Sequence, residues 1–343
     1  MNRKSFLSAL IPVGLTLSSW KEFGTALADR KTGSRIPPYL KPGDVIGITC
    51  PAGYISLDDL QPALKVMESW GFRTIIGRTV GCRDFSLGGS DKERLSDMQD
   101  MLDNNDIKAI MCARGGYGSL RIVDKLNFHK FCAHPKWMIG FSDITVLHCH
   151  ISRNFGIATI HSKMCNSFPT VWENAEPEQI ATIDSIREAL SGKPMQYRAA
   201  SNPFNRKGTT EGVLTGGNLR TIENLAGTHS EIITRNKILF IEDTGEYLYS
   251  IDRMLWNLKR SGKLEALKGL IVGGFRIKPD DPDEEFGKTL YEIVMEKVSE
   301  YSYPVCFDFP VGHQKNNYAL RCGVKHLLHV STEGVSLTST PIS

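Results

Sequence analysis

The stretch PKWMIGFSDITVLHCHISRNFG (residues 135–156) contains one full unit of the predicted fold. Its apolar run KWMIG is typical of a buried strand, and ITVLHCHISRNFG has the apolar spacing of a helix that ends at Gly156. Between them lies the turn Gly140-Phe141-Ser142-Asp143. A strand that turns sharply into a helix is the repeating unit of parallel α/β sheets.

The same unit recurs through residues 36–165. Apolar strands are predicted at DVIGITC (44–50), RTIIG (73–77), IKAIMCA (107–113) and IATIH (157–161). Helices are predicted after Ser56 and Ser90, which stand at N-cap positions, and at LRIVDKL (120–126). This alternation predicts the α/β fold class, with a parallel, doubly wound sheet over residues 36–165 as the N-terminal domain.

Residues 166–207 are punctuated by prolines and only weakly patterned, which indicates a linker with one helix near Ile183 to Leu190. A second domain is predicted over residues 208–335. Its strands are TTEGVLTGGN (209–218), KILFIED (237–243) and GLIVGGF (269–275), its helices are SIDRMLWNLKRSG (250–262) and a segment from Lys288, and HLLHVSTEGVSLTS (326–339) alternates like a hairpin. A compact α/β or barrel-like domain fits this mixed pattern.

The composition excludes several classes of function. The 343 residues carry a net charge of +3 and no long basic run, so no nucleic-acid partner is expected. The eight cysteines stand singly, without a Cys-x-x-Cys pair, which argues against a zinc ribbon or a dithiol redox site. Cys50 and Cys112 lie in strand-like runs and are expected to be buried free thiols.

The first 28 residues have the order of a secretory signal. A basic start at Arg3 and Lys4, an apolar stretch and Ala26-Leu27-Ala28 predict cleavage after Ala28. No interior segment approaches the roughly 20 apolar residues of a membrane span. We therefore expect export to the periplasm, with a cytoplasmic location as the alternative, and no membrane insertion after the signal is removed.

Two loops of the first domain are expected at one edge of its sheet, because the carboxyl ends of parallel strands meet there. RGGYGS (114–119) and GFSD (140–143) each follow a strand. A serine nucleophile needs an exposed hydroxyl, a base and N–H groups for the oxyanion. Ser142 is therefore a candidate nucleophile, with the N–H groups of Asp143 and Gly116 as the oxyanion hole. The alternative is that Ser142 caps the following helix.

The glycine loop has other interpretations. Gly116-x-Gly118 begins a dinucleotide-binding fingerprint, but Arg121 stands at the third glycine position and no acid closes the next strand. This disfavours a nucleotide-dependent oxidoreductase. Arg114 either binds the terminal carboxylate of a substrate or forms a structural ion pair, and Tyr117 either lines the cleft or packs against it.

A base and the residue that orients it must come from elsewhere in the chain. His313 follows the strand-like run FDFPVG, and Glu242-Asp243 close the strand KILFIED. In isolation, a capped loop histidine and a solvated acidic turn are the simpler explanations. His148 and His150 lie two apart on a helix and face away from each other, so they make a poor metal pair.

Five motifs together carry a resemblance. RGGYGS, PKWMIGFSDITVLH, TGGNL, ILFIEDTGE with IDRML, and FPVGH, in this order over about residues 38–335, resemble the LD-carboxypeptidase family, the S66 serine peptidases that trim peptidoglycan peptides. The resemblance implies Ser142 as nucleophile, Glu242 rather than Asp243 as the acid, and His313 as base. It also implies a flavodoxin-like N-terminal domain, a swivelling barrel-like C-terminal domain, a homodimer, and no metal or other cofactor.

The expected activity is therefore that of a muramoyltetrapeptide L,D-carboxypeptidase. His313 would take the Ser142 proton while Glu242 orients the imidazole, and D-alanine would leave a murein tetrapeptide, the expected partner, through an acyl-enzyme.

Some features leave the substrate open. Where the family commonly has His-Gly-Pro-Met, this chain has His161-Ser162-Lys163-Met164, which adds a cation beside the cleft. One alternative is a relative that hydrolyses a peptide-nucleotide antibiotic of the microcin type, with Trp172 as a clamp for the base. Another is a periplasmic protein that binds muropeptides without cutting them, although all three triad residues are present.

Overall fold

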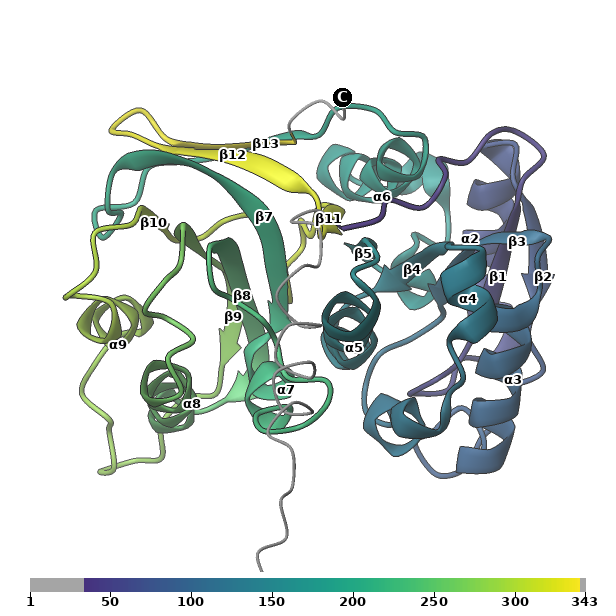
Figure 1. Ribbon diagram of the computed structural model, residues 1–343, viewed down its shortest axis with the longest axis horizontal. Coiled ribbons are helices and arrows are strands. Elements are labelled where there is room, and N and C mark those ends of the chain that lie inside the picture. Colours follow the sequence, from purple (N-terminus) through teal and green to yellow (C-terminus); the bar gives the residue numbers. More distant parts are fainter. Residues whose placement is uncertain (1–33, 340–343) are drawn as a thin grey trace, which may run out of the picture. The chain divides into compact units, whose positions relative to one another are not determined.

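The computed structural model describes residues 34–339. Its first sheet has six strands in the order β11-β5-β4-β3-β1-β2 (Figure 1). Five of them pair in parallel: β1 (Val45–Thr49), β2 (Arg73–Ile76), β3 (Ile107–Cys112), β4 (Trp137–Gly140) and β5 (Thr159–His161). The predicted parallel α/β sheet is confirmed, and the order 2-1-3-4-5 is that of flavodoxin-like folds.

Helices cover both faces of this sheet because successive strand residues point to opposite sides. One buried cluster joins α3 (Asp91–Asp103), α4 (His129–Ala133) and α5 (Thr145–Phe155) to one face. A second cluster joins α2 (Leu57–Ser69) and α6 (Pro177–Leu190) to the other. Within β4, Met138 belongs to the first cluster, whereas Trp137 and Ile139 belong to the second.

Side-chain caps begin two of these helices where the sequence places them. Ser56 accepts a hydrogen bond from the Asp59 N–H at the start of α2, and Ser90 forms a capping box with Glu93 at the start of α3.

The helix predicted at residues 120–126 is wrong. The segment forms two 3₁₀ turns, η1 (Ser119–Arg121) and η2 (Val123–Lys125), and neither has a side-chain cap. The β-branched pair Ile122-Val123 and the short length disfavour a regular α-helix here.

The second sheet has seven strands in the order β10-β9-β8-β7-β12-β13-β6. β7 (Gly208–Asn218), β8 (Lys237–Glu246), β9 (Gly269–Ile277) and β10 (Val305–Cys306) are parallel, whereas β12 (Lys325–Val330), β13 (Val335–Ser339) and β6 (Gln196–Ala199) are antiparallel. Its helices are α7 (Leu219–Asn224), α8 (Leu248–Arg260) and α9 (Leu290–Lys297). The hairpin of β12 and β13 is confirmed.

Two strands lie outside the domain limits that the sequence suggests. β6 lies in the predicted linker, which also holds the expected helix as α6, and pairs with β13 of the second sheet. β11 (Leu320–Cys322) comes from the C-terminal part of the chain but pairs antiparallel with β5 of the first sheet. The chain therefore crosses between the two sheets more than once.

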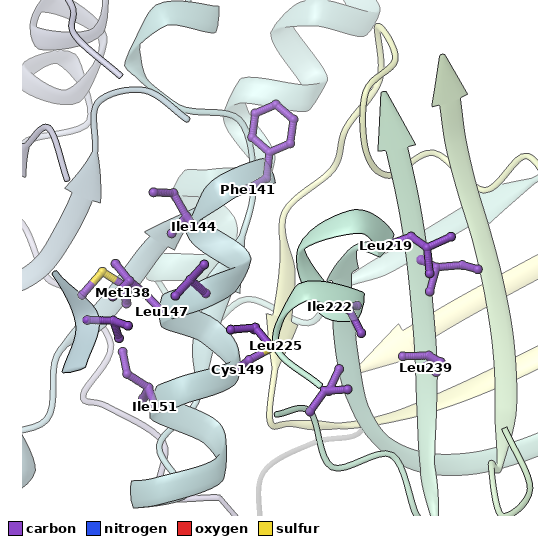
Figure 2. Close-up of a cluster of buried hydrophobic side chains, with 14 of the residues drawn as sticks. Met138, Phe141, Ile144, Leu147, Cys149, Ile151, Leu219, Ile222, Leu225 and Leu239 are labelled. Carbon is purple, nitrogen blue, oxygen red and sulfur yellow. The ribbon is translucent and has the colours of Figure 1, made fainter. Parts of the chain in front are cut away.

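An apolar cluster spans both sheets (Figure 2). From the first sheet it includes Met138 and side chains of α5 such as Leu147 and Ile151. From the second it includes the α7 residues Leu219 and Ile222. The figure also labels Phe141, Ile144, Cys149, Leu225 and Leu239. This shared core fixes the carboxyl end of β4 relative to β7 and β8.

The structure bears on two sequence predictions, the free cysteines and the lack of a membrane span. All eight cysteines are free, and Cys50 and Cys112 are buried, as expected. The predicted signal, residues 1–28, lies outside the described residues. In the part of the chain described, no helix has both the length and the apolarity needed to cross a membrane.

Candidate active site

Ser142 lies directly beyond β4, on a sharp turn into α5. Its φ is +62°, the left-handed region that non-glycine residues adopt at a cost. It is the first residue of the 3₁₀ turn η3 (Ser142–Ile144), whose N-cap is Phe141. No side chain caps this turn or the following helix α5, so Ser142 is not a capping residue. Ser142 is only partly buried, and a serine on a strained turn between a strand and a helix is the geometry of a nucleophile elbow.

A glycine is required two residues before Ser142. Gly140 has φ of +157°, and a Cβ at this position would lie 2.9 Å from Cγ1 of Ile144. Any larger residue would therefore push the start of η3 away from the strand end.

The glycine loop lies against this turn, as the sequence predicts. A Cβ added to Gly115 would come within 3.1 Å of the Ser142 Cβ. Asp143 Oδ2 accepts a hydrogen bond of 2.8 Å from the Ser119 N–H, which joins the turn to the end of the glycine loop. Burial raises the pKa of Asp143, which is offset by hydrogen bonds from Ser119. Among residues 34–339, neither the Gly116 nor the Asp143 N–H has a hydrogen-bond acceptor, so both can serve an oxyanion.

Arg94 holds this edge of the sheet together and was not identified from the sequence. Its side chain is fully buried on α3 and donates hydrogen bonds to the carbonyls of Pro51, Gly89 and Gly118 as well as to Asp91. It therefore fixes the loop after β1 and the glycine loop to one helix. Two of these carbonyl partners, Pro51 and Gly118, are far away in the sequence, so the role of Arg94 leaves no local signal.

Glu242 and His313 form a hydrogen-bonded pair near the carboxyl end of β8, an interior strand of the second sheet. His313 Nδ1 lies 2.5 Å from Oε2 of Glu242, which lies near the end of the buried part of β8. A carboxylate only accepts, so Nδ1 donates its proton to Glu242, and Nε2 is the ring nitrogen that can act as a base. Glu242 is fully buried, whereas the His313 side chain is 15% exposed.

Gly312 permits this pairing. It has φ of +101°, and a Cβ there would lie 2.3 Å from the Glu242 Cβ. The Gly312 N–H donates 2.8 Å to Oδ1 of the buried Asn317, which holds the loop before His313.

The neighbouring acid Asp243 is used differently. Its carboxylate accepts hydrogen bonds from the Asn218 side chain and from the N–H groups of Arg220 and Thr244. Burial raises its pKa to about 6. The structure therefore places Glu242, and not Asp243, on His313.

Contacts between the sheets bring together the segments that carry Ser142 and His313. The ring of Phe141, adjacent to Ser142, lies with its centroid 5.0 Å from that of His313. The N–H of Asn218, at the end of β7, donates to Thr145 Oγ1, three residues after Ser142. Gly217 allows this approach, because a Cβ there would lie 2.4 Å from Thr145 Oγ1.

Comparison with known proteins decides the family. The LD-carboxypeptidase N-terminal domain matches residues 46–162, and the LD-carboxypeptidase C-terminal domain matches residues 211–328. The chain belongs to the LD-carboxypeptidase family. The resemblance seen in the motifs is thereby confirmed.

Named relatives cover most of the chain. A probable murein peptide carboxypeptidase of Bacillus subtilis is 32% identical over 297 residues, 86% of this chain and 92% of its own length. A murein tetrapeptide carboxypeptidase of Pseudomonas aeruginosa is 31% identical over 283 residues, 80% and 89% of the two chains. A microcin C7 self-immunity protein of Escherichia coli is 25% identical over 332 residues, 88% and 95%.

A solved structure gives the same result. The muramoyltetrapeptide carboxypeptidase from Oxalobacter formigenes superposes with a TM-score of 0.75 at 28% identity, and the match covers 87% of this chain and 99% of that one.

The structure gives no substrate-binding role to Arg114 or Tyr117, the two other residues predicted for this site. Arg114 donates a hydrogen bond of 3.1 Å to the Tyr54 carbonyl, and its guanidinium lies 5.6 Å from the centre of the Tyr54 ring. Tyr117 is 53% exposed. Neither makes a contact with the Ser142 turn or with His313 that marks it as substrate-binding.

Two titratable groups beside the site were not assigned a role from the sequence. His161, at the end of β5, is fully buried, and neither ring nitrogen has a hydrogen-bond partner among residues 34–339. Burial, with the nearby histidines adding, holds its pKa well below the usual value, so His161 is neutral. Lys163 stands two residues later and is half-buried. Over residues 34–339, no cluster of three His, Cys, Asp or Glu side chains is arranged to hold a metal ion.

Proposed function

We propose that this protein is a serine-type L,D-carboxypeptidase that removes the terminal D-alanine from murein tetrapeptides. The observation that carries the proposal is the hydrogen bond between Glu242 and His313, together with the strained turn of Ser142, whose neighbour Phe141 packs against the His313 ring. Membership of the LD-carboxypeptidase family supports the same chemistry.

In the acylation step, Ser142 attacks the carbonyl of the L-residue that precedes the terminal D-alanine. His313 Nε2 takes the hydroxyl proton, and Glu242 holds the tautomer and stabilises the imidazolium. The N–H groups of Asp143 and Gly116 bind the oxyanion. His313 then protonates the departing amine, so D-alanine leaves and the tripeptide remains as an ester on Ser142.

In the deacylation step, a water molecule replaces the amine. His313 takes its proton, the hydroxyl attacks the ester carbonyl, and the same two N–H groups bind the second oxyanion. Ser142 regains its proton as the tripeptide leaves. No cofactor enters this sequence.

The microcin-type alternative depends on an aromatic clamp. Trp172, the residue considered for this role, lies in the turn η5 (Trp172–Asn174) and packs partly buried against the core under α2 and α6. This position gives the clamp no support, so we propose the murein substrate.

The test is a substrate panel. Purified protein would be incubated with a murein tetrapeptide and, separately, with an aspartyl sulfamoyl adenosine, and the products measured by mass spectrometry. Release of D-alanine from the tetrapeptide alone is expected. Cleavage of the adenosine compound alone would replace the proposal with the immunity function, and cleavage of neither would favour the binding-protein interpretation.

We further propose that the chain is exported with cleavage after Ala28 and that it works as a homodimer. N-terminal sequencing of protein recovered from the periplasm tests the first point, and an intact Met1 would refute it. Light scattering of the purified protein tests the second, and a monomeric mass at micromolar concentration would refute it.

A further inference from the structure

Lys163 is a cation at the edge of the candidate active site. Its Nζ donates a hydrogen bond of 2.8 Å to the carbonyl of Gln314, the residue after His313. The same Nζ lies 5.5 Å from the centre of the Phe141 ring, and Phe141 precedes Ser142. Lys163 therefore contacts both segments that carry the proposed reaction, one on each sheet.

The Lys163 ammonium has donors to spare. An ammonium has three N–H groups, and the protein uses one of them for the Gln314 carbonyl. No carboxylate in residues 34–339 lies within ion-pair distance of it. Burial, with the nearby charge of Arg276 adding, lowers its pKa, and the charge of Glu242 opposes this shift only in part. An anion bound at the two remaining donors would stabilise the ammonium.

The reaction supplies such an anion close by. An exopeptidase substrate ends in a carboxylate whose carbon lies only three bonds beyond the scissile carbonyl carbon, on the order of 4 Å away. A group that binds this carboxylate must therefore lie beside the nucleophile and the base. Lys163 does, whereas the Arg114 guanidinium is held against Tyr54.

We propose that Lys163 binds the terminal carboxylate of the substrate and so restricts this enzyme to removing a single C-terminal residue. The inference rests on the proposed function, since it assigns a role at the same site. Phe141 and Gln314 position the ammonium, and its two remaining donors bind the carboxylate of the leaving D-residue. The contact also places the scissile carbonyl against Ser142.

The test compares two substrates that differ only in this charge. The first is a murein tetrapeptide with a free C-terminal carboxylate, and the second is the same peptide ending in D-alaninamide. Release of D-alanine and of D-alaninamide would be measured by mass spectrometry to obtain kcat/KM for wild type, Lys163→Met, Lys163→Arg and Arg114→Met. Methionine keeps the length of the lysine stem without its charge.

Wild type should prefer the free acid. Lys163→Met should lower kcat/KM on the free acid by about 10- to 100-fold, the effect of one hydrogen bond to a charged group, and leave kcat/KM on the amide within about twofold. Lys163→Arg should keep part of the preference, and Arg114→Met should keep all of it. The amide substrate serves as the internal control that Lys163→Met is folded and has an intact triad.

Three results would overturn the inference. One is an equal loss on both substrates in Lys163→Met, which would make Lys163 a structural support of Phe141 and Gln314. The second is an unchanged preference in that variant, and the third is loss of the preference in Arg114→Met instead. If wild type released product from neither peptide, the proposed function itself would fail, which distinguishes the two failures.

Discussion

Replacing Glu242 by glutamine removes the charge that stabilises the His313 imidazolium while nearly preserving the size of the side chain. Glu242 is fully buried and lies 2.5 Å from His313 Nδ1, so solvent screens the interaction poorly. Unit charges centred about 4 Å apart interact by about 4 kcal/mol at an effective dielectric constant of 20. Because the imidazolium forms only as the reaction proceeds, this loss should lower kcat by about 10³-fold.

The chain offers a matched control for this variant. Asp243 is the adjacent acid and is equally inaccessible, but its partners are Asn218, Arg220 and Thr244. Steady-state release of D-alanine at pH 7.5 would be measured for Glu242→Gln and Asp243→Asn, with thermal unfolding of both. Asp243→Asn should lose stability but keep kcat within about tenfold. Similar losses of kcat in the two variants, or a Glu242→Gln variant within tenfold of wild type, would refute the reasoning.

Two further changes test the geometry and the electrostatics. Gly312→Ala should lower kcat by at least about 10²-fold, because its Cβ would lie 2.3 Å from the Glu242 Cβ. The control is Gly227→Ala, also at positive φ but with open space around it, which should leave kcat unchanged. An equal loss of kcat in both variants would count against the explanation. Lys136 is buried, and desolvation, with Lys108 adding, lowers its pKa to about 8. The unfolded chain then binds more protons than the folded one between about pH 8 and pH 10.4. The free energy of unfolding should therefore rise with pH across this window, by on the order of 2–3 kcal/mol relative to Lys136→Met. Urea unfolding at several pH values measures this difference, and parallel curves for the two proteins would contradict it.

Most of the first sheet could be predicted from the sequence because its signals are local. Buried strands appear as short apolar runs, and a serine three residues before Glu93 marks the start of α3. The helix expected at residues 120–126 failed because apolar content alone does not separate an α-helix from two 3₁₀ turns. β11 could not be placed, since its partner β5 lies about 160 residues earlier in the chain.

Some residues of the candidate site could likewise be predicted from local sequence, and others could not. Ser142 and His313 were found through motifs, and Gly140 and Gly312 are explained by the close contacts they permit. The contributions of Arg94 and Lys163 depend on partners distant in the sequence, such as Gly118 for Arg94 and Gln314 for Lys163. No periodicity or spacing encodes such contacts. The choice between Glu242 and Asp243 rested on resemblance, and the structure adds the contacts: Glu242 is hydrogen-bonded to His313, whereas Asp243 accepts from Asn218 and from two backbone N–H groups.

The central claim is that Ser142 is the nucleophile of a carboxypeptidase reaction. The most direct measurement is the rate of D-alanine release from a murein tetrapeptide by wild type and by Ser142→Ala, with circular dichroism to show that the variant is folded. We expect wild type to release D-alanine and Ser142→Ala to be slower by about 10⁴- to 10⁶-fold. A folded Ser142→Ala variant that releases D-alanine at a rate near that of wild type would contradict the account.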